Sequence, residues 1–133
     1  MVFKQIDNLD DFYSIIMNKE NENNLIIAYF TATWCGPCKQ ISPVIQNIGE
    51  NNEFIIVLKI DVDEASEISD QYKIDCMPTF KFFKNCNIEE CFSCAGANET
   101  NLINNIKNIL SEDTTNNNND NNNNNNNNND NDK

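Results

Sequence analysis

The sequence of 133 residues contains no His and no Arg. Without an imidazole, the chain cannot hold a Ser-His-Asp triad, a His-containing zinc site or a His acid–base step. Its nine Lys residues stand against 21 acidic residues, and the formal net charge is −12. Such a chain lacks the basic surface that neutralises nucleic-acid phosphates or anionic lipids. We therefore expect no nucleic acid and no membrane as partner, and we look for chemistry in Cys, Asp, Glu, Lys or Tyr.

Long apolar runs and a targeting signal are also missing. The first eleven residues carry one base, Lys4, and three acids, Asp7, Asp10 and Asp11, unlike a secretory segment. No apolar run approaches the roughly 18–20 residues of a membrane helix. We expect a cytoplasmic protein, where six Cys residues are more typical of catalytic, metal-binding or free thiols than of a disulfide framework.

Hydrophobic periodicity predicts an alternation of strands and helices, in the order β-α-β-α-β-α-β-β-α. Asp7 is the expected N-cap of the first helix, and Asn98 or Thr100 that of the last. The order favours a sheet built by right-handed crossovers, with helices on both faces. The predicted strands are Val2–Ile6, Leu25–Thr31, Phe54–Ile60, Thr79–Phe83 and Ile88–Phe92, and the predicted helices cover 9–16, 38–48, 65–72 and 102–110.

The C-terminal segment differs from the rest in composition. Residues 111–133 include fourteen Asn and, from Asn116 onward, no apolar side chain. Ordering such a segment costs entropy that burial cannot offset. We predict one domain, 1–110, and a disordered Asn-rich tail, 111–133. The tail is interpreted as a tolerated extension or as a self-associating segment.

The motif Cys35-Gly36-Pro37-Cys38 follows an apolar strand and opens a helix, which is the setting of a redox pair. Unpaired amides and the macrodipole at a helix N-terminus lower the pKa of a thiol there. We therefore expect Cys35 to be the more exposed and the nucleophile, and Cys38 to resolve the mixed disulfide. A zinc site would need two more ligands, for which this helix start is a poor scaffold.

Four segments of the chain resemble thioredoxin, in the right order and at nearly the right separations. The resemblance covers residues 1 to about 110. Within the family, the chain is most similar to the cytosolic eukaryotic members. The matching segments are Thr31-Ala32-Thr33-Trp34-Cys35-Gly36-Pro37-Cys38-Lys39, Lys59-Ile60-Asp61-Val62-Asp63, Cys76-Met77-Pro78-Thr79-Phe80 and Gly96-Ala97-Asn98.

The resemblance implies the thioredoxin fold, an α/β architecture with a central mixed sheet flanked by helices on both faces. It implies a protein-disulfide reductase that cycles Cys35 and Cys38 between dithiol and disulfide. It also implies a cis Met77–Pro78 peptide, with the Met77 backbone pairing with an extended substrate. The substrate groove would be formed by Trp34, Gly36, Pro37, Met77, Pro78, Gly96 and Ala97.

The resemblance further implies partners and an electron source. Disulfide-containing proteins would be the substrates, and a thioredoxin reductase would be the electron donor. We expect a monomer with no bound cofactor and no metal.

The chain departs from the family at Tyr29. Thioredoxins have a buried Asp six residues before the first Cys, paired with a Lys that Lys59 matches here. A Tyr is no proton acceptor at pH 7, although its hydroxyl could donate to a thiolate. Tyr29 could equally just fill the core. Our hypothesis is that resolution by Cys38 is slowed but not abolished.

A second departure is the segment 83–96, about two residues longer than in the family. It contains Cys86, Cys91 and Cys94. On a regular strand, Cys91 and Cys94 would point to opposite faces, unless a bulge intervenes. These thiols could be spare, regulatory, or part of an all-Cys metal site with Cys76. Cys76, beside the groove, is the candidate regulatory thiol, or else a small buried apolar residue.

Three functions therefore compete. The first is the protein-disulfide reductase. The second is a redox-dependent protein-binding module of the same fold with weakened catalysis, which Tyr29 favours. The third is a metal carrier based on the Cys cluster.

Overall fold

The computed structural model describes residues 2–118 of the chain, with side chains described for 3–111. The chain forms two compact units, and the boundary between them lies between Glu99 and Thr100. The first unit contains five strands, three α-helices and a short 3-10 helix. These elements are β1 (Val2–Gln5), α1 (Leu9–Met17), η1 (Lys19–Asn21), β2 (Leu25–Thr31), α2 (Gly36–Asn51), β3 (Ile55–Asp61), α3 (Ser66–Gln71), β4 (Thr79–Phe83) and β5 (Phe92–Ala95).

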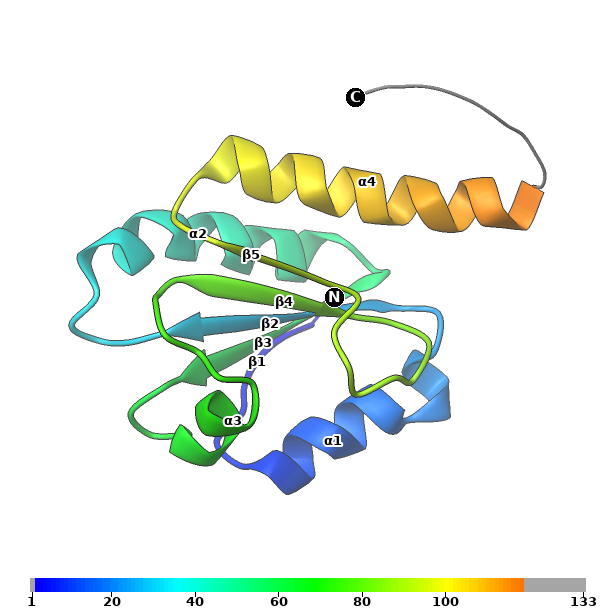
Figure 1. Cartoon of the computed structure of the whole chain (residues 1–133). Helices are drawn as coiled ribbons and strands as arrows, with labels where there is room; N and C mark the ends of the chain where they lie inside the picture. The colour runs from blue at the N-terminus through cyan, green and yellow to red at the C-terminus, as the bar shows by residue number, and fades with distance from the viewer. Residues whose placement is uncertain (1, 119–133) are drawn as a thin grey trace. The chain divides into compact units, whose positions relative to one another are not determined.

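The five strands form one mixed sheet in the order β1-β3-β2-β4-β5. β1 and β2 pair parallel with β3, whereas β4 is antiparallel to both β2 and β5. Helices α1 and α3 lie on one face of this sheet and α2 on the other (Figure 1). The predicted mixed sheet with helices on both faces is confirmed.

The central strands are those with the most continuous apolar sequence. Every residue of β2 and β4 is buried, because both lie inside the sheet and are covered on both faces. In β2, Ile26, Ala28 and Phe30 belong to the core that also includes Phe12 of α1. Tyr29 and Thr31 alternate with them and therefore point to the α2 face. One strand thus supplies an apolar face and a partly polar one.

Helix α1 begins at Leu9, the predicted start, but its N-cap lies one residue later than expected. Its N-cap is Asn8, whose side chain accepts a hydrogen bond of 2.9 Å from the Asp11 backbone N–H. The prediction of Asp7 was wrong, although both residue types are good caps. Phe12 and Ile16, one turn apart, are the buried residues of this helix.

The segment after β4 differs from the prediction. A strand was expected over Ile88–Phe92, but β5 spans Phe92–Ala95. Asn85 and Cys86 have φ of 61° and 60°, which places two consecutive residues in the left-handed region. The chain therefore leaves the sheet in a loop, and the Cys91 backbone N–H returns to the Phe82 carbonyl at 2.7 Å. Of Cys91 and Cys94, which were considered together on one strand, only Cys94 lies on a strand.

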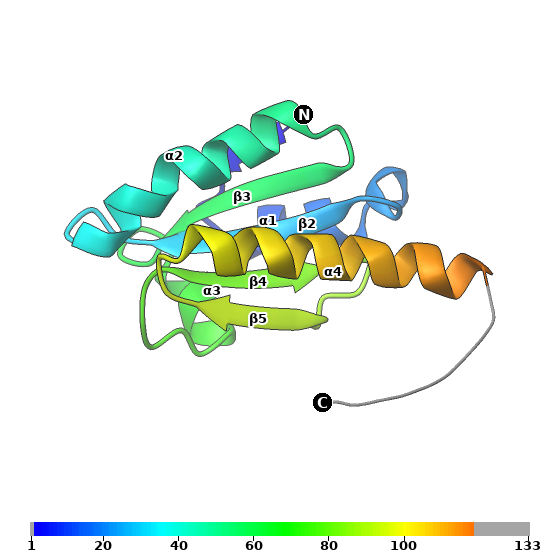
Figure 2. The same ribbon diagram turned by 90° about the horizontal axis from the view of Figure 1, so that it is seen from above.

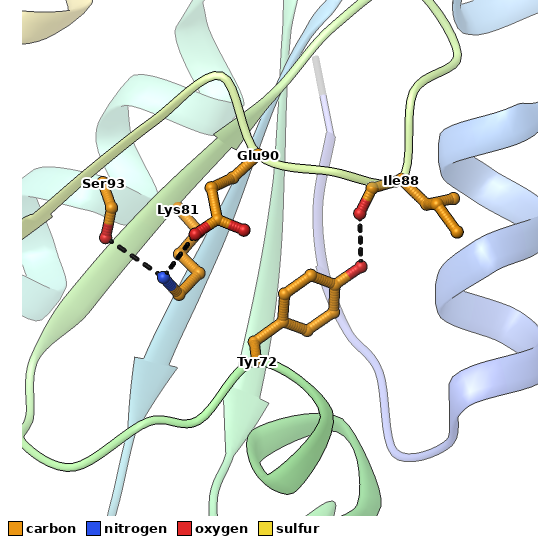
Figure 3. Close-up of polar contacts among 5 residues, drawn as sticks. All are labelled: Tyr72, Lys81, Ile88, Glu90 and Ser93. Carbon is orange, nitrogen blue, oxygen red and sulfur yellow. Dashed lines mark hydrogen bonds and ion pairs between the residues drawn. The ribbon is translucent and has the colours of Figure 1, made fainter.

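Three polar contacts attach this loop and the start of β5 to the domain (Figure 3). Lys81 Nζ, on β4, lies 2.8 Å from Glu90 Oε2 and 3.3 Å from Ser93 Oγ. The Tyr72 hydroxyl donates to the Ile88 carbonyl at 2.7 Å. Burial and, second, the neighbouring Tyr13 raise the pKa of Tyr72, so this hydroxyl keeps its proton. The segment 83–96 is therefore held by specific hydrogen bonds.

The second unit contains α4 (Glu99–Asn118), the long helix seen lengthwise in Figure 2. Its buried residues are Leu102, Ile106 and Ile109, which recur at helical spacing. The helix begins directly after Asn98 and continues beyond Leu110, the expected last residue of the domain. The remainder of the predicted tail, 119–133, lies outside the described residues. No helix within 2–118 has the length and apolarity needed to cross a bilayer.

Candidate active site

Cys35 lies at the junction between β2 and α2. It is the N-cap of α2, with extended backbone angles of φ −88° and ψ 111°. Its Sγ accepts a hydrogen bond of 3.1 Å from the Cys38 backbone N–H, in the way a Ser or Asp oxygen caps a helix. Gly36 and Pro37 form the first helical positions, where Pro costs no hydrogen bond. This position favours negative charge on the Cys35 sulfur.

Cys35 and Cys38 form a disulfide, with their Cα atoms 5.3 Å apart. Both residues are buried, with 5 % and 2 % of their surfaces exposed. Cys35 is the more exposed of the two, as expected, although both are buried in this oxidised state. The cause is local packing, because Ala32, Val62 and Met77 surround the disulfide.

The backbone of Met77 lies beside the disulfide. The Met77 carbonyl oxygen lies 3.8 Å from Cys35 Sγ. The Met77–Pro78 peptide is cis, as the resemblance implied. The Gly96 N–H donates to the Pro78 carbonyl at 2.9 Å, so Gly96 lies next to this turn. Its φ of 100° is one that side chains rarely adopt, which explains the glycine.

Trp34 stands at the rim of the site. It is 65 % exposed, and its Nε1–H donates to Asp63 Oδ2 at 2.8 Å. A large apolar ring is therefore held in solvent by a charge-assisted hydrogen bond. Exposed apolar surface of this kind, next to a reactive disulfide, is suited to contact with a protein partner.

A pocket of about 140 Å³ lies behind Cys38, on the α2 face of the sheet. The Tyr29 hydroxyl donates to the Cys38 backbone carbonyl at 3.2 Å. The Tyr29 ring stacks on Phe80, with centroids 5.3 Å apart and an interplanar angle of 11°. Tyr29 therefore both fills the core and supports the first turn of α2. The pocket is lined by Tyr29, Thr31, Ala32, Thr33, Cys38, Lys39, Ser42, Lys59 and Asp61.

Asp61 is the pocket residue that the sequence reasoning missed as a site residue. It is only 7 % exposed. It occurs two positions after Lys59 on the same strand, so the period-2 alternation of β3 already placed both on one face. That spacing was the available signal.

The remaining cysteines are spread over the domain. Cys76 Sγ lies 3.7 Å from the Thr79 hydroxyl, and Cys86 Sγ donates to the Asn18 carbonyl at 3.7 Å. Cys76 is exposed, so it is not a buried apolar residue. Within the part of the chain that the structure describes, no three Cys, Asp or Glu side chains are grouped so as to hold a metal ion.

A dithiol pair that closes to a disulfide at the start of a helix, beside a backbone carbonyl and a cis X–Pro peptide, defines a thiol–disulfide oxidoreductase. Comparison with known proteins agrees with this class. The thioredoxin family model matches residues 4–108. The chain belongs to the thioredoxin family, and the predicted enzyme activity is confirmed.

Named relatives and solved structures give the same result. The chain is 40 % identical to thioredoxin of Ictalurus punctatus over 99 residues, which covers 73 % of this chain and 89 % of the relative. It is 36 % identical to thioredoxin of Gallus gallus, covering 80 % and 98 %. The crystal structure of Fasciola hepatica thioredoxin superposes with a TM-score of 0.73 at 33 % identity, covering 80 % and 98 %.

Proposed function

We propose that this oxidoreductase reduces disulfides in partner proteins, with Cys35 as the nucleophile and Cys38 as the resolving thiol. The observation that carries the assignment of roles is the hydrogen bond from the Cys38 N–H to Cys35 Sγ. A backbone donor and the N-terminus of a 16-residue helix both favour the thiolate of Cys35 over its thiol. Cys38, inside the first turn, lacks that position.

The proposed reaction has two steps. The Cys35 thiolate attacks one sulfur of the substrate disulfide, and the other substrate sulfur leaves as a thiolate. Cys38 then attacks Cys35 Sγ, the intramolecular disulfide forms, and the substrate is released fully reduced. Two electrons pass to the substrate, and the Cys35–Cys38 disulfide must be reduced again before the next cycle.

We propose that substrates bind as extended segments along Met77. Its carbonyl lies 3.8 Å from Cys35 Sγ, so a segment paired with this backbone would bring its sulfur to the nucleophile. Exposed Trp34, Gly36 and Pro37 would line one side of this groove. Gly96 and Ala97 would line the other, since Gly96 is bonded to Pro78.

The test is reduction of insulin disulfides by the full chain, with dithiothreitol as electron source. Cys35→Ser should abolish the activity above that of dithiothreitol alone. Cys86→Ser, at a cysteine on the loop after β4, is the matched control and should retain full activity. Equal activity of the native chain and Cys35→Ser would contradict the proposal.

The alternative is a binding module with weakened catalysis, and Tyr29 favours it. The Tyr29 hydroxyl is engaged by the Cys38 carbonyl and is no proton acceptor at neutral pH. This alternative predicts a stable mixed disulfide with insulin and little turnover. The same assay therefore separates the two functions.

Further parts of the proposal concern the protein in the cell. We propose a cytoplasmic monomer, whose catalytic domain is 1–110 and whose electron donor is a thioredoxin reductase. Lys59 would favour the Cys38 thiolate electrostatically, and exposed Cys76 would be a regulatory thiol. Turnover with purified thioredoxin reductase and NADPH would test the electron donor. Comparing that turnover before and after oxidation, in the native chain and in Cys76→Ser, would test the regulatory thiol.

A further inference from the structure

The second chemical step needs a proton acceptor. Only the thiolate of Cys38 can attack Cys35 Sγ, so the Cys38 proton must leave first. Cys38 is 2 % exposed, and bulk water therefore has little direct access to it. A base is required on the side of Cys38 where the pocket lies.

The register of β2 and β3 brings four polar residues to that side. Tyr29 is paired with Lys59, and Thr31 is paired with Asp61. Partners in adjacent strands point to the same face, and Tyr29 contacts Cys38 in α2. Lys59 and Asp61 therefore lie on the α2 face, and both line the pocket with Cys38.

Asp61 is buried, yet half of its carboxylate is uncommitted. Its Oδ1 accepts the Asp63 backbone N–H at 2.9 Å and that of Glu64 at 3.4 Å. Within residues 2–118, the structure gives its Oδ2 no hydrogen-bond partner and no ion pair. A buried carboxylate oxygen without a partner is costly unless water or a reacting group uses it.

The other titratable groups that face Cys38 across the pocket are poor acceptors. Tyr29 donates its hydroxyl proton to the Cys38 carbonyl. Lys39 on α2 and Lys59 on β3 are cations, which favour a thiolate but accept no proton. Asp61 is thus the one carboxylate among the residues that line this pocket.

We propose that Asp61 is the general base of the resolving step, a role that rests on the Cys35/Cys38 function proposed above. Cys38 gives its proton to the Asp61 carboxylate through water in the pocket, whose volume of about 140 Å³ and lining hydroxyl and charged groups accommodate it. The Cys38 thiolate forms the bond to Cys35 Sγ, and the Cys35–substrate bond breaks. The leaving substrate sulfur keeps the electron pair and takes a proton from solvent.

The return of the proton completes the cycle. Asp61 releases its proton to solvent through pocket water, on the side where exposed Thr33 and Lys39 line the pocket. When a reductase opens the disulfide, the same path runs in reverse and protonates Cys38. Lys59 then has a positioning and electrostatic role beside Asp61.

The experiment follows the mixed disulfide directly. Reduced full-length protein is mixed with a peptide that forms a disulfide-linked dimer, quenched with acid, alkylated and measured by mass spectrometry. Formation of peptide-linked Cys35 reports the first step, and its decay reports resolution by Cys38. Native protein is compared with Asp61→Asn, Asp61→Glu and the control Asp70→Asn, an exposed residue of α3.

Asp61→Asn retains the Oδ1 acceptor for the Asp63 N–H and should fold. At about pH 6, its mixed disulfide should decay about 100-fold more slowly than in native protein, the low end of general-base effects. The gap should narrow toward about pH 9, where hydroxide replaces the base. Formation should be unchanged, Asp70→Asn should behave as native, and Asp61→Glu should resolve about 10-fold faster than Asp61→Asn.

Three results would overturn the role of Asp61: equal decay at every pH, slowing by one constant factor at every pH, or no rescue by Asp61→Glu. The first step serves as the internal check of folding. Failure of this proposal leaves the insulin activity and its loss in Cys35→Ser intact, so the two proposals fail separately.

Discussion

Two lysines on the same sheet show how differently one fold uses a buried charge. Lys81 on β4 is 9 % exposed and is neutralised by Glu90 at 2.8 Å, with Ser93 as a further acceptor. Lys59 on β3 is half-buried, and within residues 2–118 no carboxylate lies within ion-pair distance of it. The Lys81 ammonium is therefore bound by its partners, whereas Lys59 lines the pocket behind Cys38.

The comparison teaches that the two regions serve stability and chemistry separately. Around Lys81, every polar atom named has a partner, and the result is a fixed loop (Figure 3). Around Lys59, polar atoms without partners face a pocket beside a reactive sulfur. Variants in the first region should therefore change the free energy of unfolding, and variants in the second should change rates.

Tyr29→Asp should produce the largest change in both stability and rate. It tests the separation of stability from chemistry, because Tyr29 belongs to both the core and the pocket. Losing a 1 % exposed ring stacked on Phe80 should cost about 3–5 kcal/mol of unfolding free energy. The new carboxylate beside Cys38 should accelerate resolution of the mixed disulfide by up to about 10-fold. Denaturant unfolding and the mixed-disulfide assay measure the two effects.

Tyr29→Phe is the control for that variant. It keeps the stacked ring and removes the hydrogen bond to the Cys38 carbonyl, so a loss of about 1 kcal/mol is expected. Equal resolution rates in native protein and Tyr29→Asp at all pH values would contradict the hypothesis that Tyr in place of the family's Asp slows resolution of the mixed disulfide by Cys38.

Lys81→Met should come next. It leaves Glu90 without its cation, at a cost of about 2 kcal/mol because the Glu90 side chain is still 32 % exposed. Insulin reduction should stay at the native rate. Glu90→Gln and the double variant complete a thermodynamic cycle, and a coupling energy near zero would show that the pair does not hold the loop.

Tyr72→Phe should have the smallest effect, about 0.5–1 kcal/mol, through loss of the hydrogen bond to the Ile88 carbonyl. The pKa of Tyr72 is raised in the folded state, mainly by burial. Its contribution is therefore fully present below about pH 10, the ordinary value for Tyr, and is lost as the pH rises further. Unfolding measured between pH 8 and about 11 should show a steeper alkaline loss in native protein than in the variant; parallel curves would argue against it.

The sequence predicts some elements of this fold to the residue. The strands at Leu25–Thr31 and Thr79–Phe83 were predicted with the bounds that β2 and β4 have, since buried strands are continuous apolar runs. The strand at Ile88–Phe92 was misplaced. The segment begins and ends with apolar residues, Ile88 and Phe92, but the loop geometry at Asn85 and Cys86 depends on long-range contacts that periodicity cannot reveal.

The site was predictable where it is local in sequence. Cys35 and Cys38 are the first and last residues of one four-residue motif, and helix physics alone predicts Cys35 as the nucleophile. The position of Asp61 beside Cys38 could not be predicted from its neighbours in sequence alone, because it depends on the register between β2 and β3. The burial of Cys35 also escaped prediction, since Met77 packs against it from 42 residues away in the chain.

The position of Trp34 has an optical consequence. The chain contains one Trp, so all of its indole fluorescence originates from a single ring at the mouth of the site. That ring is solvent-exposed, bonded through Nε1 to Asp63, and adjacent in sequence to the sulfur that changes oxidation state. We therefore expect the emission wavelength and intensity of this single indole to change when a partner binds and when the disulfide opens, without any added label.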